Sequence, residues 1–238
     1  MSAPEPQRPV SAPLIRALGA VPVFSGLAPD ELAAVAGHLR RRSFNERDVI
    51  VTHGTPGNIL YILVSGRVKV SRPGEDGETI IAVFSSGDFF GELSVLDGGE
   101  RSADVVALEP TEVLALSTED VYACIHQYPA ISITLLREMA GRLRRSTEWI
   151  RSLSSQDVYG RIAAQLLHLA RVHGTDVPGG GRLIRLRLTQ NDLAGIVGAS
   201  RESVNKAMGY FKSKGYISVD TTHHITVFNQ EALEQRSR

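Results

Sequence analysis

The chain has 238 residues, of which 42% are hydrophobic and 22% charged, and its formal net charge is zero. This length allows two modest domains, each with its own core. The hydrophobic runs are short and interrupted, which excludes a membrane-spanning helix. The single cysteine, Cys124, excludes an internal disulfide and a cysteine-ligated cluster, so we expect a cytoplasmic protein without a metal site. Residues 1–19 are Pro-rich and lack the pattern of a signal peptide, which predicts a disordered tail.

Short helical pieces are predicted within residues 14–40, and a different pattern begins at Arg42. From there to Leu116, short β-rich runs alternate with turns containing Gly, Asp or Pro. The runs are 49–51, 59–64, 68–70, 79–84, 105–107 and 113–116. Many short strands at near-regular spacing predict a sandwich or barrel, which we place at residues 20–128.

A long helix is predicted over residues 129–153, and its apolar positions form a narrow stripe. They recur at alternating spacings of three and four: Ile133, Leu136, Ala140, Leu143, Thr147 and Ile150. This is the seam of a short coiled coil, so we expect the helix to pair with a second copy in a homodimer. The charged residues between, Arg142 among them, are assigned to the intervening face. The alternative is an amphipathic helix packed only on its own domain.

The C-terminal part, residues 158–238, is predicted to be a second domain that follows a hinge at 154–157. Residues 155–238 have 11 Lys and Arg against 7 Asp and Glu, so their net charge of +4 suits a polyanion. The pattern predicts a helix over 158–173, a loop over 174–181 and a strand over 182–188. Two short helices and a hairpin of 216–219 with 225–228 follow.

The segment LTQNDLAGIVGASRESVNKAMGYFKSKGYI, residues 188–217, predicts a helix-turn-helix with a following wing. Thr189 caps the first helix, Gly198 supplies the turn, and Ser200 caps the second helix. The exposed N-terminal face of such a second helix enters the major groove of DNA. The alternative is an ordinary helical hairpin with a solvated charged face. The candidate DNA-contacting residues are Thr189, Asn191, Ser200, Arg201, Glu202, Ser203, Asn205 and Lys206.

A second motif, FGELSVLDGGERSADVVAL at residues 90–108, predicts a site for a phosphate. The segment from Gly91 to Leu96 can begin a short helix with free backbone N–H groups. Arg101 and Ser102 then offer a guanidinium and a hydroxyl. Glu92 can accept a hydrogen bond from a sugar hydroxyl. The alternative is a purely structural ion pair between Glu92 and Arg101.

With both motifs in this order, residues 20–230 resemble the cyclic-AMP receptor protein and FNR family of bacterial transcription regulators. The resemblance implies an α+β fold: an N-terminal cyclic-nucleotide-binding β-roll, a long dimerisation helix and a C-terminal winged helix-turn-helix. It implies cyclic AMP as effector, with Glu92 on the ribose and Arg101, Ser102 and the backbone near Gly91 on the cyclic phosphate. The full set of ligand residues it implies is Gly91, Glu92, Leu93, Arg101, Ser102, Ala103, Ile81, Ala82, Phe84, Leu143, Ser146 and Thr147. The loop before Arg101 is one residue shorter than in the enterobacterial member.

The same resemblance implies double-stranded DNA with a palindromic TGTGA-like site, and RNA polymerase, as partners. Lys206 stands where the enterobacterial member has Arg, which weakens the expected readout at one base pair. An activator and a repressor are both compatible with the motifs.

Other interpretations remain open at this point. The iron–sulfur branch of the family needs several cysteines, and the haem branch needs axial ligands, whereas His38, His53 and His126 are isolated. Cyclic GMP or cyclic-di-GMP could replace cyclic AMP, or the pocket could be vestigial and the regulator independent of ligand. A regulatory module of an enzyme or channel is disfavoured by the C-terminal motif. No nucleophile, base and orienting group stand together, so no enzyme is predicted.

Overall fold

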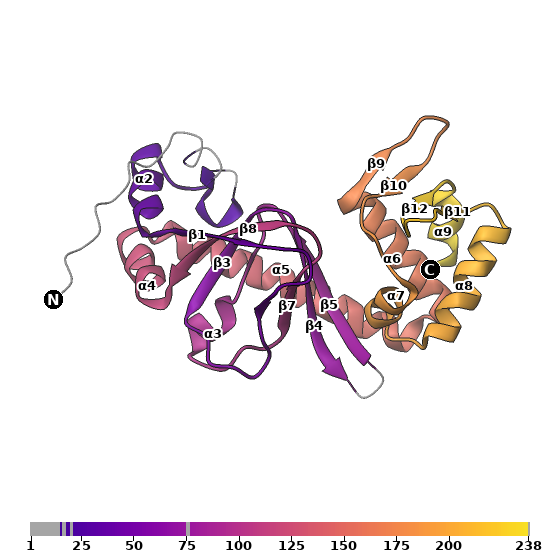
Figure 1. The fold of residues 1–238 in the computed structure, drawn as a ribbon, viewed down its shortest axis with the longest axis horizontal. Helices are drawn as coiled ribbons and strands as arrows, with labels where there is room; N and C mark the ends of the chain where they lie inside the picture. Colours follow the sequence, from indigo (N-terminus) through magenta and orange to yellow (C-terminus); the bar gives the residue numbers. More distant parts are fainter. Residues whose placement is uncertain (1–14, 16–17, 20, 75–76, 238) are drawn as a thin grey trace. The chain divides into compact units, whose positions relative to one another are not determined.

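A computed structural model describes residues 15, 18–19, 21–74 and 77–237 (Figure 1). Most of the tail predicted for residues 1–19 lies outside these residues. The chain forms two compact units, one of Met1–Pro73 with Ile81–Leu143 and one of Gly74–Ile80 with Arg144–Arg238. None of the described helices combines the length and the apolar content needed to cross a membrane.

The first unit is a roll of two four-stranded antiparallel sheets with helices around it (Figure 1). The strand orders are β1-β8-β3-β6 and β2-β7-β4-β5. In chain order, the elements are η1 (Pro22–Phe24), α2 (Pro29–His38), β1 (Arg40–Phe44), β2 (Val49–Val51), β3 (Ile59–Ser65), β4 (Arg67–Gly74), β5 (Gly77–Ser85), β6 (Phe89–Phe90), α3 (Glu92–Asp97), β7 (Asp104–Ala107), β8 (Thr111–Ser117) and α4 (Thr118–Gln127).

Two apolar clusters hold this unit together. One lies within the roll and draws on strands of both sheets, including Leu63, Val68 and Val105. The other joins η1, α2, α4 and the next helix, α5, to strands β3 and β8, with Phe24, Val35, Leu60, Val121 and Leu135 among its members. Burying this apolar surface is the main favourable term in the folding of the unit.

The sequence pattern missed β1, β6 and α4. Strand β1 reads Arg-Arg-Arg-Ser-Phe and only its last residue is partly buried, so it has no apolar alternation to detect. Its backbone nevertheless pairs with β8 along its whole length, from Arg40 opposite Ala115 to Phe44 opposite Thr111. Backbone pairing does not depend on side-chain polarity, which explains the omission.

Helix α5 (Ala130–Ser155) turns two different faces to its surroundings. Ile131 and Leu135 are buried in the core of the first unit. The predicted seam lies on the other face, where Leu136, Leu143 and Ile150 are 65%, 69% and 65% exposed. Ile133, Ala140 and Thr147 are exposed as well. The chain on its own therefore leaves this apolar row uncovered.

The second unit is a winged helix-turn-helix. Its elements are α6 (Val158–His173), β9 (Gly174–Asp176), β10 (Arg182–Ile184), α7 (Gln190–Val197), α8 (Arg201–Ser213), β11 (Ile217–Val219), β12 (Ile225–Val227) and α9 (Gln230–Arg236). The strands form a sheet in the order β11-β12-β10-β9. Ile162, Leu166, Phe211, Val227 and Leu233 lie in its core and are fully buried. The predicted α+β architecture with a wing is confirmed.

Four details of the second unit and of the helix that leads into it differ from the sequence-based expectation. Residues 174–176 are not part of a loop, because they form β9 and pair antiparallel with β10. The strand predicted over 182–188 ends at Ile184. Helix α5 continues to Ser155, so the break before α6 is confined to residues 156–157, where Asp157 caps α6 by accepting from Gly160 N at 2.8 Å. Helix α9 was not predicted.

Candidate functional site

The phosphate motif begins at a sharp turn between β6 and α3. Gly91 adopts the left-handed conformation, with φ 81°, and leads directly into the helix. A Cβ at this position would lie 2.5 Å from Nη1 of Arg101 and 2.8 Å from the Ile59 carbonyl oxygen. Only glycine fits this turn, both for its backbone angle and for the space left by Arg101.

Arg101 is buried beneath this turn, with 7% of its surface exposed. Its Nη1 donates to the Gly91 carbonyl and to Ser94 Oγ, both at 2.8 Å, and its Nη2 donates to the Ile59 carbonyl at 2.8 Å. Burial lowers the pKa of Arg101, with an opposing contribution from Tyr61 and Glu92. An arginine with a lowered pKa still carries its charge near neutral pH. The motif thus contains a fixed cation whose hydrogen-bond partners are all neutral.

Glu92 is also buried, with 4% exposed, and its partner comes from α5. Arg142 Nη1 donates to Glu92 Oε1 at 2.9 Å, and Nη2 donates to the Phe89 carbonyl at 2.5 Å. The guanidinium carbon lies 4.7 Å from the ring centroid of Phe84 and 4.5 Å from that of Phe89. The structure therefore pairs Glu92 with Arg142 and not with Arg101, the structural alternative considered from the sequence.

Arg142 was misassigned to the charged face of the long helix. A second helical stripe in the sequence indicates the inward position of Arg142, but the apolar row of the predicted seam masks it. This stripe has spacings of four, four and three: Ile131, Leu135, Met139 and Arg142. The first two are buried and Met139 packs against the same core. An arginine on an inward face needs a carboxylate partner, and Glu92 is that partner.

The remaining residues expected around a ligand differ in exposure. Ala103 is buried, and Ala82 and Phe84 are partly buried. Leu93, Ser102, Ile81, Leu143, Ser146 and Thr147 are exposed. The motif thus brings together Gly91, Glu92, Arg101 and, through Arg142, Phe84. Ser146 and Thr147 lie about one helical turn after Arg142 on α5, in the part of that helix assigned to the second unit.

The helix-turn-helix is built by local hydrogen bonds, as the sequence predicts. Thr189 and Asp192 form a reciprocal capping box, with Asp192 N donating to Thr189 Oγ1 at 3.1 Å and Thr189 N donating to Asp192 Oδ2 at 2.8 Å. Gly198 ends α7 in the left-handed conformation, with φ 58°. Ser200 Oγ caps α8 by accepting from Ser203 N at 3.2 Å. These caps define where α7 ends and where α8 begins, and so fix the direction of α8 relative to α7.

The N-terminal half of α8 presents polar side chains to solvent. Arg201, Glu202, Asn205 and Lys206 are exposed, and Val204, Ala207 and Met208 face the core. Lys206 Nζ lies 2.7 Å from Glu202 Oε1, and this hydrogen bond raises the pKa of Lys206 and lowers that of Glu202. Asn205 accepts from Gln190 Nε2 at 2.8 Å, which ties α8 to the start of α7.

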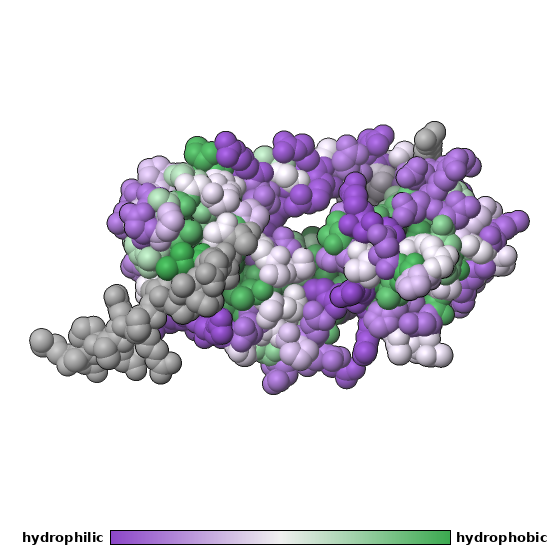
Figure 2. All heavy atoms as spheres, turned by 90° about the horizontal axis from the view of Figure 1, so that it is seen from above, coloured by the Kyte–Doolittle hydropathy of each residue, from purple (hydrophilic) through white to green (hydrophobic). Residues whose placement is uncertain are grey.

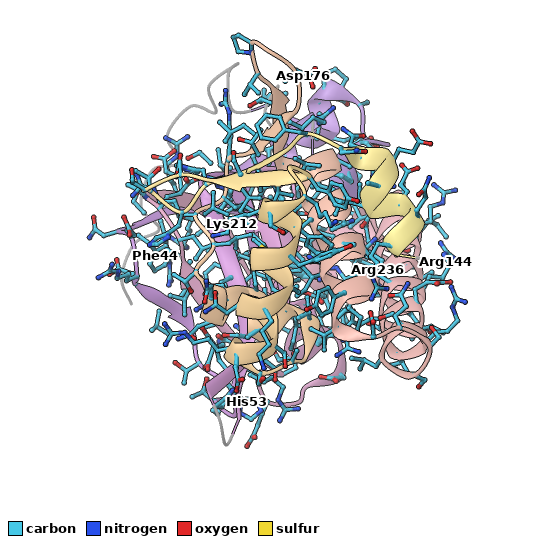
Figure 3. All side chains as sticks on the ribbon, turned by 90° about the vertical axis from the view of Figure 1, so that its right-hand side faces the viewer. Phe44, His53, Arg144, Asp176, Lys212 and Arg236 are labelled. Atoms are coloured by element: carbon cyan, nitrogen blue, oxygen red, sulfur yellow. The ribbon has the colours of Figure 1, made fainter. Side chains whose placement is uncertain are left out.

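A groove of about 520 Å³ runs between α7, α8 and the wing. Its lining includes Thr189, Asn191, Arg201, Asn205, Lys212 and His223. Lys212 is labelled on α8 in Figure 3. The visible face of the molecule is mainly hydrophilic, with smaller hydrophobic patches (Figure 2). Arginine, lysine and amide groups in such a groove can form hydrogen bonds with the base edges and the phosphates of a nucleic acid.

Comparison with known proteins decides the family. Residues 41–128 match the cyclic nucleotide-binding domain, and residues 160–236 match the Crp-like helix-turn-helix domain. The chain is 36% identical over 217 residues to the CRP-like cAMP-activated global transcriptional regulator of Mycobacterium tuberculosis, covering 91% of this chain and 96% of that protein. The chain belongs to the CRP/FNR family. It is a ligand-responsive, DNA-binding transcription regulator.

Solved structures agree with this assignment. The catabolite activator protein of Thermus thermophilus is 34% identical, with a TM-score of 0.53 over 91% of this chain and 98% of that one. The c-di-GMP responsive global regulator CLP of Xanthomonas campestris has a TM-score of 0.73 at 23% identity, over 82% of this chain and 96% of that one, and shares the fold.

The buried ion pair makes a prediction about stability. Arg142→Met leaves Glu92 buried without a partner and should lower the free energy of unfolding by about 2–4 kcal/mol, somewhat below the value for a fully buried pair because Arg142 is partly exposed. Adding Glu92→Gln to Arg142→Met should restore at least about 1 kcal/mol. Urea unfolding of wild type, both single variants and the double variant measures this coupling. If Glu92→Gln changes the free energy of unfolding by the same amount in wild type and in Arg142→Met, the two side chains are not coupled.

Proposed function

We propose that this regulator responds to cyclic AMP and binds a palindromic TGTGA-like operator as a homodimer. The observation that carries the proposal is the motif of Gly91, Glu92 and Arg101, which sets a fixed cation beside a paired carboxylate. A cyclic nucleotide has an anion and a ribose hydroxyl a short distance apart, and these two groups complement that motif. The cAMP-activated relative from Mycobacterium tuberculosis, named above, supports the same effector.

Each implied residue has a proposed role. Arg101, Ser102 and the backbone at Gly91 bind the cyclic phosphate, and Glu92 accepts from the ribose. Leu93, Ala103, Ile81, Ala82, Phe84 and Leu143 line the ligand, with Ser146 and Thr147 contributing hydroxyls to the adenine. Arg142 joins this set because it holds Glu92 at 2.9 Å and shields it with Phe84.

A different nucleotide is the second candidate, since a regulator of the same fold is described as c-di-GMP responsive. Cyclic-di-GMP has two phosphates and two bases, so it needs a larger cationic site than one arginine beside one carboxylate. The motif residues therefore favour a single cyclic mononucleotide.

Effector identity is tested by calorimetric titration with cyclic AMP, cyclic GMP and cyclic-di-GMP. We expect binding heat with cyclic AMP. Arg101→Ala should weaken that binding by about 2–5 kcal/mol, because it removes a charge-assisted contact from a desolvated site. Arg145→Ala, on an exposed part of α5, is the control and should bind as wild type does. Absence of heat with wild-type protein and millimolar cyclic AMP would overturn the proposed effector.

The homodimer is proposed through the apolar row on α5. Leu143 is 69% exposed in the single chain, so Leu143→Glu should leave its own unit folded. In the dimer, this charge would be buried against its symmetry mate, and we expect monomers. Light scattering measures the mass. Arg145→Glu, a charge reversal on the opposite face, should remain dimeric. A dimer of Leu143→Glu would place the interface elsewhere.

Operator recognition is assigned to α8. Arg201→Ala should cost about 1–3 kcal/mol and flatten the preference at the base pair that Arg201 reads, because arginine grips guanine O6 and N7 together. Lys206→Ala should change specificity less, since lysine lacks that planar fork. Binding curves on single-substituted operators at one fixed salt concentration test this, because phosphate contacts move all affinities together. If Arg201→Ala weakens all operators equally, Arg201 is a phosphate contact.

A further inference from the structure

The guanidinium of Arg101 is fixed by three hydrogen bonds that use only part of its donors. Both N–H groups of Nη1 are used, one on the Gly91 carbonyl and one on Ser94 Oγ, and Nη2 uses one on the Ile59 carbonyl. Within the residues that the structure describes, Nε and the second N–H of Nη2 have no protein partner. Nε and Nη2 share one edge of the guanidinium, and this edge grips phosphate or carboxylate with two parallel hydrogen bonds.

Ser94 is the one side chain among the three acceptors. It lies in the middle of α3, is 4% exposed, and its hydroxyl also donates to the Gly91 carbonyl at 3.3 Å. The hydroxyl thus bridges the turn at Gly91 and the guanidinium. Because it is neutral, it orients Arg101 without cancelling the charge that an anion needs.

Gly57, in the loop before β3, packs against the flat face of the same group. A Cβ on Gly57 would lie 2.1 Å from Nε, 2.4 Å from Cζ and 2.6 Å from Cδ of Arg101. Near-equal distances to three successive atoms place the Cβ position over the face of the guanidinium and not at its edge. Alanine cannot occupy this position unless Arg101 moves.

We propose that Ser94 and Gly57 are positioning residues that hold Arg101 so that its Nε–Nη2 edge meets the anionic group of the effector. Ser94 sets the rotation of the guanidinium through Nη1, and Gly57 leaves the space in which its plane lies. The proposal rests on the function proposed above, because the anion it assigns to this edge is the cyclic phosphate. It adds two residues that act through Arg101 to the determinants of affinity.

The first test uses Ser94→Ala and two phosphorothioate analogues of cyclic AMP, each with sulfur in place of a different exocyclic oxygen. Wild type should discriminate between the two, because Nε and Nη2 are not equivalent donors and a fixed guanidinium presents each of them to a different exocyclic oxygen. Ser94→Ala should raise the Kd for cyclic AMP by about 5- to 30-fold, since one buried N–H of Arg101 loses its acceptor. It should also bring the ratio of the two analogue Kd values toward one. Ser94→Thr keeps the hydroxyl and should recover part of that ratio.

The second test compares Gly57→Ala with Gly37→Ala. Gly37 lies on α2, and a Cβ there meets nothing within 4 Å, so this variant adds the same methyl group without a clash. Gly57→Ala should raise the Kd for cyclic AMP by about 10-fold or more through displacement of the guanidinium, and should lower analogue discrimination. Gly37→Ala should match wild type in both. Urea unfolding confirms that each variant is folded.

The outcomes separate the two proposals. If wild type binds neither cyclic AMP nor its analogues, the proposed function is wrong, and the positioning role is wrong as well. If wild type binds and both variants keep its Kd and its analogue ratio, the positioning role alone is wrong. If the variants lose affinity equally for both analogues, so that the ratio is unchanged, Ser94 and Gly57 support the roll in general and do not orient Arg101.

Discussion

The ion pair between Glu92 and Arg142 is the polar contact that fixes the rotation of helix α5 against the first unit. It joins the start of α3 to the middle of α5, two elements fifty residues apart, at an N–O distance of 2.9 Å. A carboxylate buried as deeply as Glu92 is costly unless its charge is paired and hydrogen-bonded. Arg142 meets that need only if α5 keeps one rotation about its axis. The same rotation buries Leu135 and leaves Leu136 and Leu143 exposed. The ion pair and the burial of Leu135 therefore require the same rotation of α5, and this rotation leaves the apolar row exposed.

Two arginines, Arg101 buried and Arg142 partly buried, serve different purposes in this unit. Arg142 pairs with Glu92 and lies against the rings of Phe84 and Phe89, so its positive charge is balanced within the protein. Arg101 is held only by two carbonyls and a hydroxyl, so its charge remains available. Because Glu92 is committed to Arg142, it does not compete for Arg101. This division explains how a carboxylate and an arginine with an unneutralised charge coexist in one short motif, as the proposed anion site requires.

The sequence predicted many of the elements whose signals are local, although it missed α4 and α9, which begin with local caps at Ser117 and Asn229. The caps at Thr189 and Ser200, the turn at Gly198 and the bounds of α6 depend on neighbours within a few residues, and all are found as expected. It missed what depends on distant partners. Strand β1 forms because its backbone pairs with β8, which is distant in the sequence. Arg142 faces inward because it pairs with Glu92, which lies on a different element. The inward stripe of α5 was hidden because an exposed apolar row on the same helix dominates the hydrophobic pattern.

The pairing of Glu202 with Lys206 has a consequence for the recognition helix. Both side chains are more than two-thirds exposed, so their ion pair adds little to stability and is cheap to rearrange. While it persists, Lys206 is turned along the helix toward Glu202 and its charge is offset. Arg201 has no such neighbour among the ion pairs of the described residues, and it lines the groove beside Asn205. Under the proposed operator recognition by α8, Arg201 is thus the cation that would reach a base edge without first giving up a partner, and we expect base discrimination to depend mainly on it.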